Sequence, residues 1–203
     1  MKIAIIGATG RVGTRLIDEA LSRGHTVTAI ARQADKLPAR PGLATVNADV
    51  ANTKALAAAL AGHDVAISTV RFLQATAEQI IGAVKAAAVP RLLVVGGAGS
   101  LYVAPEVQLV DTPQFPEIYK AEALAGRDFL NALRKETAID WTFLSPAALF
   151  EPGTRTGKFR VGEETLLTDA SGKSWISMED YAIAMLDEVE KPAHSRQRYT
   201  VAY

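Results

Sequence analysis

The feature that most constrains this chain is a set of three glycines, Gly7, Gly10 and Gly13, placed directly after an apolar run at residues 3–6. The apolar run is typical of a buried β-strand. Beyond it, apolar side chains recur at helical spacing, at Val12, Leu16, Ala20 and Leu21. Glycine tolerates tight turns and close backbone contacts that other residues do not. The chain therefore begins with a tight turn from a strand into a helix.

The rest of the chain repeats the alternation of short apolar runs with longer amphipathic segments. We expect strands at residues 27–31, 44–46, 65–69, 92–95 and 141–144, with a strand-like end at 198–203. Most of these runs lack polar alternation, which is typical of parallel strands buried on both faces. A second helical stripe comprises Ile118, Ala121, Ala125, Phe129 and Leu133. The order predicts the α/β class, with a Rossmann-type doubly wound parallel sheet and helices on both faces.

Length and patterning predict one domain over residues 1–203, because this length suits a single core. From about residue 150 to 175 the composition changes to Gly, Thr and charged residues, which predicts a small C-terminal cap or lid of irregular structure. Ser177 and Asp180 then stand at capping-box-like spacing and predict a final helix. Its inward stripe comprises Ala182, Met185, Leu186 and Val189.

Composition excludes several classes of partner. Lys plus Arg and Asp plus Glu both total 22, so no net charge points to nucleic acid. No apolar run approaches the roughly 18 residues of a membrane-spanning helix. There is no cysteine, and His25, His63 and His194 are scattered, so we expect no metal site. We expect a cytoplasmic monomer or homodimer without nucleic-acid or membrane partners.

Glycines at this spacing, between a strand and a helix, indicate a dinucleotide site. Gly7 would allow the tight turn, Gly10 would let the backbone approach a pyrophosphate, and Gly13 would let the helix pack close to the sheet. Thr9 and Val12 belong to the same turn, where the N–H groups at the start of the helix can face phosphate. A glycine-rich turn without a ligand is the alternative.

The end of the second expected strand bears on the choice of dinucleotide. A site for NAD usually carries an acid there, about 20 residues after the glycines, to bind the adenosine ribose. Arg32 stands at this point, and a guanidinium suits the 2′-phosphate of NADP(H). Lys36 and Arg11 are further candidate cations, whereas Asp35 argues in the opposite direction. We expect NADP(H) to be preferred over NAD(H), the alternative being that these are solvated loop cations.

Residues that follow the third and fourth expected strands are further candidates for the cofactor site, because ligands of doubly wound folds bind at the carboxyl ends of the strands. Asp49 and Val50 follow the third strand, and Ser68, Thr69 and Val70 end the fourth. Asp49 is placed either to meet the adenine amine or to cap the next helix.

The chain resembles the atypical branch of the short-chain dehydrogenase/reductase superfamily that includes NADH-flavin reductases, NmrA-like proteins and biliverdin-reductase-B-like proteins. The resemblance extends over nearly the whole chain. The resemblance is carried by residues 7–13, by Val94 to Leu101, by Asp140 to Ala147, and by Ser177 to Ala182. It implies a nicotinamide cofactor across the C-terminal edge of the sheet, Gly97 beside it, and a pocket beneath the segment after Pro146.

The chain departs from the superfamily at its usual catalytic pair, a Tyr and a Lys four residues later, in which the ammonium lowers the phenol pKa. Here Tyr119 is followed by Ala123 at the lysine position. Lys120 points roughly 100° away from Tyr119 around the helix and does not substitute. The usual proton relay to a carbonyl is therefore broken.

Three functions remain open. The first is an NAD(P)H-dependent reductase of flavin or quinone-like acceptors, which take a hydride with little acid catalysis and bind as substrates rather than as prosthetic groups. The second is a non-catalytic NADP(H) sensor in which the cap responds to the cofactor. The third is a nucleotide-sugar epimerase or dehydratase. The candidate substrate-facing residues are Ser100, Tyr102, Tyr119 and Lys120.

Overall fold

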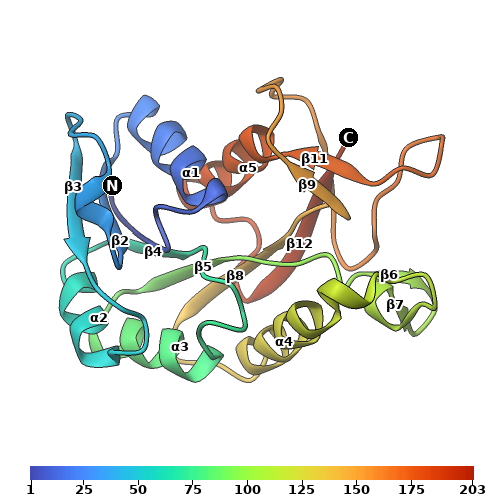
Figure 1. Cartoon of the computed structure of the whole chain (residues 1–203), viewed down its shortest axis with the longest axis horizontal. Coiled ribbons are helices and arrows are strands. Elements are labelled where there is room, and N and C mark those ends of the chain that lie inside the picture. Colours follow the sequence, from blue (N-terminus) through green and yellow to red (C-terminus); the bar gives the residue numbers. More distant parts are fainter.

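The computed structural model describes all residues, 1–203, and is built around one eight-stranded sheet (Figure 1). The strands lie in the order β10-β12-β8-β5-β4-β1-β2-β3. Their bounds are β1 (Lys2–Ile6), β2 (Thr26–Ala31), β3 (Leu43–Asn47), β4 (Val65–Ser68), β5 (Arg91–Val95), β8 (Asp140–Ser145), β10 (Arg160–Gly162) and β12 (Gln197–Ala202). Every neighbouring pair is parallel except β10 and β12. The strand order reverses between β1 and β4, which creates the crevice where ligands of such folds bind.

Helices cover both faces of this sheet. Their bounds are α1 (Arg11–Ser22), α2 (Thr53–Leu60), α3 (Ala77–Ala86), α4 (Glu117–Leu133) and α5 (Met178–Glu190). In Figure 1, α1 and α5 lie above the sheet and α2, α3 and α4 lie below it. Two separate apolar clusters result, one on each face. The predicted doubly wound α/β fold is confirmed. No helix is long and apolar enough to cross a membrane.

The start of α5 follows the sequence prediction closely. Ser177 is its N-cap residue, and the Ser177 hydroxyl accepts a hydrogen bond from the Asp180 N–H at 3.0 Å. Such a cap satisfies one of the four N–H groups that have no partner at the start of a helix. The predicted inward residues Ala182, Met185 and Leu186 are buried. The capping pattern therefore locates the last helix correctly.

The predicted stripe of α4 is wrong in its first half. Ile118 is 81% exposed and Ala121 is also exposed, whereas Phe129 and Leu133 are buried. Only the later turns pack on the sheet, and the first turns reach toward the hairpin of β6 (Tyr102–Ala104) and β7 (Val107–Gln108) (Figure 1). An apolar repeat does not reveal where a helix leaves the sheet that it covers.

The cap is less irregular than the sequence predicts. Four short strands lie outside the main sheet: β6 (Tyr102–Ala104), β7 (Val107–Gln108), β9 (Leu149–Glu151) and β11 (Trp175–Ser177). Within the cap, β9 pairs with β11, and β10 joins the main sheet as its antiparallel edge strand. These strands are only two or three residues long. They are therefore too short to produce a visible alternation in the sequence.

Buried and half-buried carboxylates at the start of α5 hold the cap in place. The Asp180 carboxylate accepts hydrogen bonds from the backbone N–H groups of Thr156 and Gly157, at 2.7 and 2.9 Å, and from the Tyr203 hydroxyl at 2.7 Å. Glu179 accepts from the Gly153 N–H at 2.7 Å. Residues 153–157 are thereby fixed to α5 through bonds to charged acceptors, which are the stronger kind.

Candidate functional site

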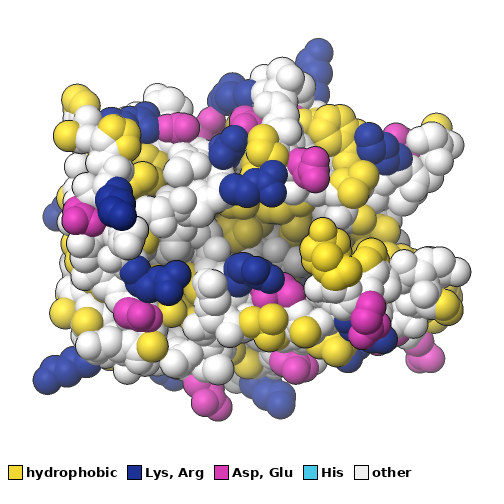
Figure 2. Space-filling model, in the orientation of Figure 1, with side chains coloured by type: hydrophobic (Ala, Val, Ile, Leu, Met, Phe, Trp, Pro, Cys, Tyr) yellow, Lys and Arg dark blue, Asp and Glu magenta, His cyan; other side chains and the backbone are white.

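A cavity of about 810 Å³ opens where β1, β2, β3 and β4 end. Figure 2 shows a hollow across this face of the molecule, with an apolar floor and with Lys and Arg side chains at its rim. The cavity is lined by Gly7, Thr9, Gly10, Ile30, Ala31, Arg32, Gln33, Ala48, Asp49, Val50, Thr69, Val70, Arg71 and Gln74. It lies at the reversal of strand order, where doubly wound folds bind their ligands.

The glycine turn forms one wall of the cavity. Gly7 adopts a φ of +80°, and a Cβ there would lie 2.6 Å from the Thr69 hydroxyl oxygen. A Cβ on Gly13 would lie 2.6 Å from the Ala8 carbonyl oxygen, so α1 packs directly on the turn. No side chain caps α1 at Gly10. The N–H groups of its first turn are therefore available to a phosphate.

The end of β4 is tied to this turn. The Thr69 hydroxyl lies 3.0 Å from the Ile6 carbonyl oxygen and 2.9 Å from that of Gly7, and it donates toward both. The neighbouring Val70 lines the cavity as well. Because the two strands are bonded at the point where they leave the sheet, this part of the wall is held without a ligand. The arrangement fits the pyrophosphate of a dinucleotide.

Arg32 is the cationic side chain at the far end of the cavity. It is exposed, and its guanidinium forms no hydrogen bond or ion pair within the chain. Lys36 lies in the short 3₁₀ turn Ala34–Lys36, outside the lining, and Arg11 is exposed at the start of α1, also outside it. Of the three candidate cations, Arg32 alone lines the cavity.

Of the remaining candidate cofactor-binding residues, some line the cavity and others lie below its surface. Asp49 and Val50 line the cavity, and Asp49 also accepts a hydrogen bond from the Ala51 N–H at 2.9 Å. The alternative that Asp49 caps the next helix is wrong, because Asn52 is the N-cap residue of α2 and its side chain accepts a hydrogen bond from the Ala55 N–H at 3.0 Å. Ser68 is buried beneath the surface, and Val12 is half-buried in α1.

Sequence reasoning missed several lining residues, chiefly Gln33, Arg71 and Gln74. Gln33 follows Arg32 after β2, and Arg71 and Gln74 follow β4. The rule that placed Thr69 and Val70 at the site, that residues after a parallel strand face the ligand, extends to these positions. The loop after β4 is simply longer than the two residues assigned to it.

The candidate catalytic residues are not brought together. Ser100 is buried, and its hydroxyl oxygen lies 3.4 Å from a guanidinium nitrogen of Arg198, which donates to it. Tyr119 is 59% exposed at the start of α4. The Lys120 ammonium lies 3.7 Å from the carboxylate of Glu117 on the same helix. No hydrogen bond joins the side chains of Ser100, Tyr119 and Lys120, so they form no proton relay in this structure.

Ala123 packs closely against the loop after β5. A Cβ added to Gly99 would lie only 2.7 Å from the Ala123 Cβ. Helix α4 therefore packs directly against the turn that follows β5. Ala123 itself is half-buried at this contact. The lysine of the usual pair is absent.

Gly97, the last cofactor candidate, lies outside the lining of the cavity. A Cβ on Gly97 would lie 3.8 Å from the ring of Phe72, in the loop after β4. Tyr102 is bonded to the cap, because its N–H donates to the Glu164 carbonyl and its carbonyl accepts from the Leu166 N–H, both at 2.9 Å. The segment after β5 is thus bonded to the cap at Tyr102.

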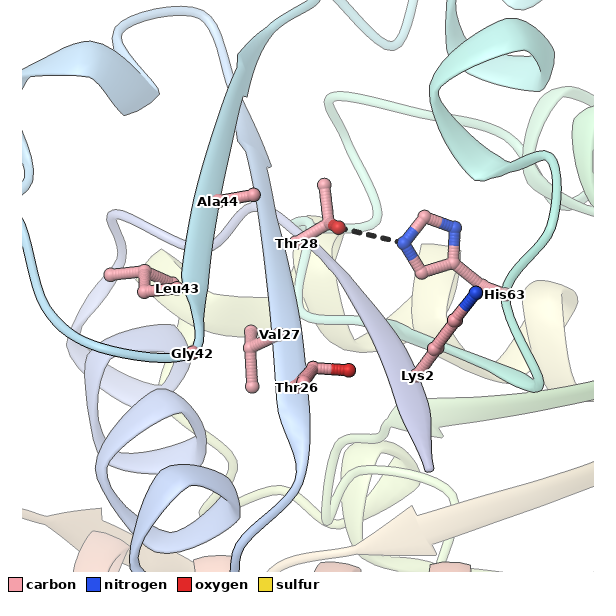
Figure 3. Close-up of a pocket in the computed structure, with 8 residues that line it drawn as sticks. All are labelled: Lys2, Thr26, Val27, Thr28, Gly42, Leu43, Ala44 and His63. Atoms are coloured by element: carbon pink, nitrogen blue, oxygen red, sulfur yellow. Dashed lines mark hydrogen bonds between the residues drawn. The ribbon is translucent and has the colours of Figure 1, made fainter.

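A smaller hollow of about 330 Å³ lies at the opposite edge of the sheet, where β1, β2 and β3 begin. Figure 3 shows His63 turned toward Thr28, with 2.7 Å between the ring nitrogen and the hydroxyl oxygen. The other ring nitrogen lies 2.9 Å from the Leu60 carbonyl oxygen. His63 is therefore fully engaged in local bonds. No group of three or more His, Cys, Asp or Glu residues is placed to hold a metal ion.

The doubly wound sheet, the glycine turn and the uncapped helix define a dinucleotide-binding protein of the Rossmann type. Comparison with known families agrees with this class. Residues 7–192 match the NAD(P)H-binding family, which is nearly the whole chain, and the chain belongs to that family.

Relatives of the chain share its full length. Protein YwnB of Bacillus subtilis is 42% identical over 99% of this chain and 98% of its own. A "putative epimerase" from Bacteroides thetaiotaomicron is 43% identical with a TM-score of 0.95, over 100% of this chain and 96% of its own. A "putative NADH-flavin reductase" from Streptococcus pneumoniae is 36% identical with a TM-score of 0.87, over 100% and 99%. The two names imply different reactions, so the likeness establishes the family and not the chemistry.

Proposed function

We propose that this chain is an NADPH-dependent reductase that delivers a hydride to a flat conjugated acceptor such as a flavin or a quinone. The observation that carries the cofactor preference is Arg32, an unpaired guanidinium on the wall of the cavity after β2. An adenosine 2′-phosphate is the part of NADPH that NADH lacks, and a guanidinium can bind it through two parallel hydrogen bonds.

The cofactor preference is tested by titrating the chain with NADPH and with NADH and following nicotinamide fluorescence. We expect tighter binding of NADPH, and we expect Arg32→Ala to weaken NADPH about tenfold or more while leaving NADH nearly unchanged, as loss of one charge-assisted contact predicts. Lys135→Ala is the matched control, since it removes an exposed cation that follows α4 and does not line the cavity. Equal affinities for the two cofactors in the parent chain would overturn the assignment.

We infer the class of acceptor from the absence of the usual lysine in α4. Ala123 stands where a lysine would lower the pKa of Tyr119, so the chain offers no evident acid for a carbonyl oxygen. NADPH, when bound, would supply a hydride to a flavin or quinone ring, which would take its proton from water. The chain itself would hold the nicotinamide and the acceptor at reacting distance and orientation, and would exclude water around them. The name of the streptococcal relative agrees with a flavin as the acceptor, although it gives NADH as the donor.

An acceptor screen tests the reductase proposal directly. Steady oxidation of NADPH in the presence of free flavin or a small quinone supports it, and no turnover with any acceptor contradicts it. The name of the Bacteroides relative favours an epimerase as the second candidate. That reaction would regenerate its nicotinamide in every turnover, so it would show no net oxidation of NADPH. A sensor would bind the cofactor, would turn over nothing, and would change protease sensitivity in the cap.

The absence of cysteine suits a reducing compartment, and we propose a cytoplasmic location on that basis. Fractionation of the producing cell with an antibody against this chain is the test, and recovery outside the cytoplasm would contradict it.

A further inference from the structure

The loop between β4 and α3 carries much of the cavity wall, and it is fastened to α4. Glu122 of α4 is 23% exposed in its side chain. One of its carboxylate oxygens accepts a hydrogen bond from the Phe72 N–H at 2.7 Å, and the other accepts from the Leu73 N–H at 3.3 Å. The second oxygen also lies 3.6 Å from the Arg71 guanidinium. A single carboxylate thus contacts three consecutive residues of the loop.

An aromatic contact completes the attachment. The Phe72 ring lies against Gly126, one turn after Glu122, where a Cβ would come within 2.8 Å of the ring. The ring also stacks on Phe143 of β8, with centroids 6.0 Å apart and planes 20° apart, and it contacts Phe129 with centroids 5.4 Å apart. The side chain of Phe72 is therefore packed between the sheet and α4, and its backbone is held by the carboxylate above.

The residues on either side of Phe72 and Leu73 face the cavity. Val70 and Arg71 precede them and Gln74 follows, and all three line the cavity wall. A loop of this length loses considerable conformational entropy when it is ordered. If the loop were free before the cofactor arrived, binding would have to pay for that ordering. In this chain the ordering is already provided by α4.

We propose that Glu122 is a positioning residue for the cofactor: it fixes the loop at residues 70–74 through the N–H groups of Phe72 and Leu73, and so preorganises the cavity wall. This inference rests on the proposed cofactor site. Glu122 immediately precedes Ala123, the position of the missing lysine. The turn of α4 that carries a proton-relay cation elsewhere in the superfamily carries here a carboxylate that binds backbone.

Two variants separate the backbone contact from the charge. Glu122→Ala removes both acceptors. Glu122→Gln keeps one carbonyl oxygen for the Phe72 N–H but loses the negative charge. Glu117→Ala is the matched control, because Glu117 lies on the same helix and is 86% exposed in its side chain. Thermal unfolding shows that each variant is folded at the temperature of measurement.

The first readout is amide hydrogen exchange without any cofactor. We expect the Phe72 and Leu73 amides to exchange at least about tenfold faster in Glu122→Ala, because local opening controls such exchange. The second readout is the Kd for NADPH, which we expect to weaken about tenfold in Glu122→Ala and to recover to within about threefold of the parent in Glu122→Gln. Glu117→Ala should change neither.

Three results would overturn the inference: unchanged exchange at Phe72 in Glu122→Ala, an unchanged Kd despite faster exchange, or a Glu122→Gln variant as weak as Glu122→Ala. The last would assign the effect to charge and not to the backbone bonds. A parent chain that binds NADPH but reduces no acceptor would refute the reductase proposal alone. The two failures are therefore distinguishable.

Discussion

The cavity and the cap are built in different ways. The cavity, at the ends of β1 to β4, depends on backbone geometry: a glycine at φ +80° and a helix that begins without a side-chain cap. The cap depends on side chains that meet across long stretches of sequence. The Glu19 carboxylate of α1, for example, binds the Arg155 guanidinium at 2.9 Å, from 136 residues away. We therefore expect the cavity to tolerate little change in shape, and the cap little change in charge.

Substitution in the glycine turn should give the largest effect. Gly7→Ala places a Cβ 2.6 Å from the Thr69 hydroxyl oxygen, in a backbone conformation that disfavours any side chain. We expect the Kd for NADPH to weaken about 100-fold, which corresponds to about 2.7 kcal/mol. Titration by nicotinamide fluorescence measures it.

Gly24→Ala is the control for backbone strain. Gly24 has a φ of +78°, close to that of Gly7, but a Cβ there meets nothing within 4 Å. We expect it to cost about 1 kcal/mol of stability and to leave the Kd unchanged. Equal losses of affinity in the two variants would show that strain, and not the shape of the cavity wall, limits binding.

Removal of the Asp180 charge should give the next largest effect, on the cap and on stability. Asp180→Asn weakens the bonds from Thr156, Gly157 and Tyr203 to a buried acceptor. We expect a loss of about 2 kcal/mol in the free energy of unfolding, with little change in NADPH affinity. Thermal unfolding should show the melting temperature falling by several degrees, and Asp128→Asn, on an exposed site of α4, should leave it unchanged.

Acid should loosen the cap before it affects the glycine turn. Hydrogen bonds from Arg155 hold the pKa of Glu19 below its usual 4.5. Burial opposes ionisation of Asp180, but the bonds from Thr156, Gly157 and Tyr203 outweigh it and lower the pKa below 3.8. A carboxylate with a lowered folded-state pKa stabilises the fold above its unfolded pKa and loses this contribution as pH falls toward the folded value.

The melting temperature should therefore be steady down to about pH 5 and should fall below about pH 4. Glu19→Gln should be less stable than the parent at pH 7 but should show a shallower fall in acid, because one of the titrating groups is gone. A parallel fall in the two chains would remove Glu19 from the explanation.

The smallest effect is expected at Tyr119. Its side chain is exposed, and the lysine that would activate its hydroxyl is absent. We expect Tyr119→Phe to change kcat for flavin reduction less than about twofold, since no general-acid contribution, ordinarily about 100-fold or more, is lost. A tenfold fall in kcat with an unchanged KM would show that the hydroxyl takes part in proton transfer without a lysine.

The difference between the cavity and the cap also explains which features could be predicted from the sequence. The conformation of residues 3–13 depends on contacts between neighbours in the sequence. Their spacing alone therefore predicts the turn, the helix and the site beside them. The same holds for the cap residue Ser177, whose partner is three residues away. Neither the exposure of Ile118 nor the bonds of Asp180 to the cap can be derived this way, because each depends on where distant segments pack. Glu122 was missed for the same reason, since its partners lie about 50 residues earlier.

The contact between Gly99 and Ala123 ties α4 to the turn after β5. A Cβ at Gly99 would lie 2.7 Å from the Ala123 Cβ, so any larger residue at position 99 would push the helix away from that turn. Gly126 of the same helix rests on the Phe72 ring, where a Cβ would come within 2.8 Å. Helix α4 is therefore fitted to two loops at once, the one after β5 and the one after β4. A substitution at Gly99 would for this reason be felt in the cavity wall at residues 70–74, although Gly99 does not line the cavity.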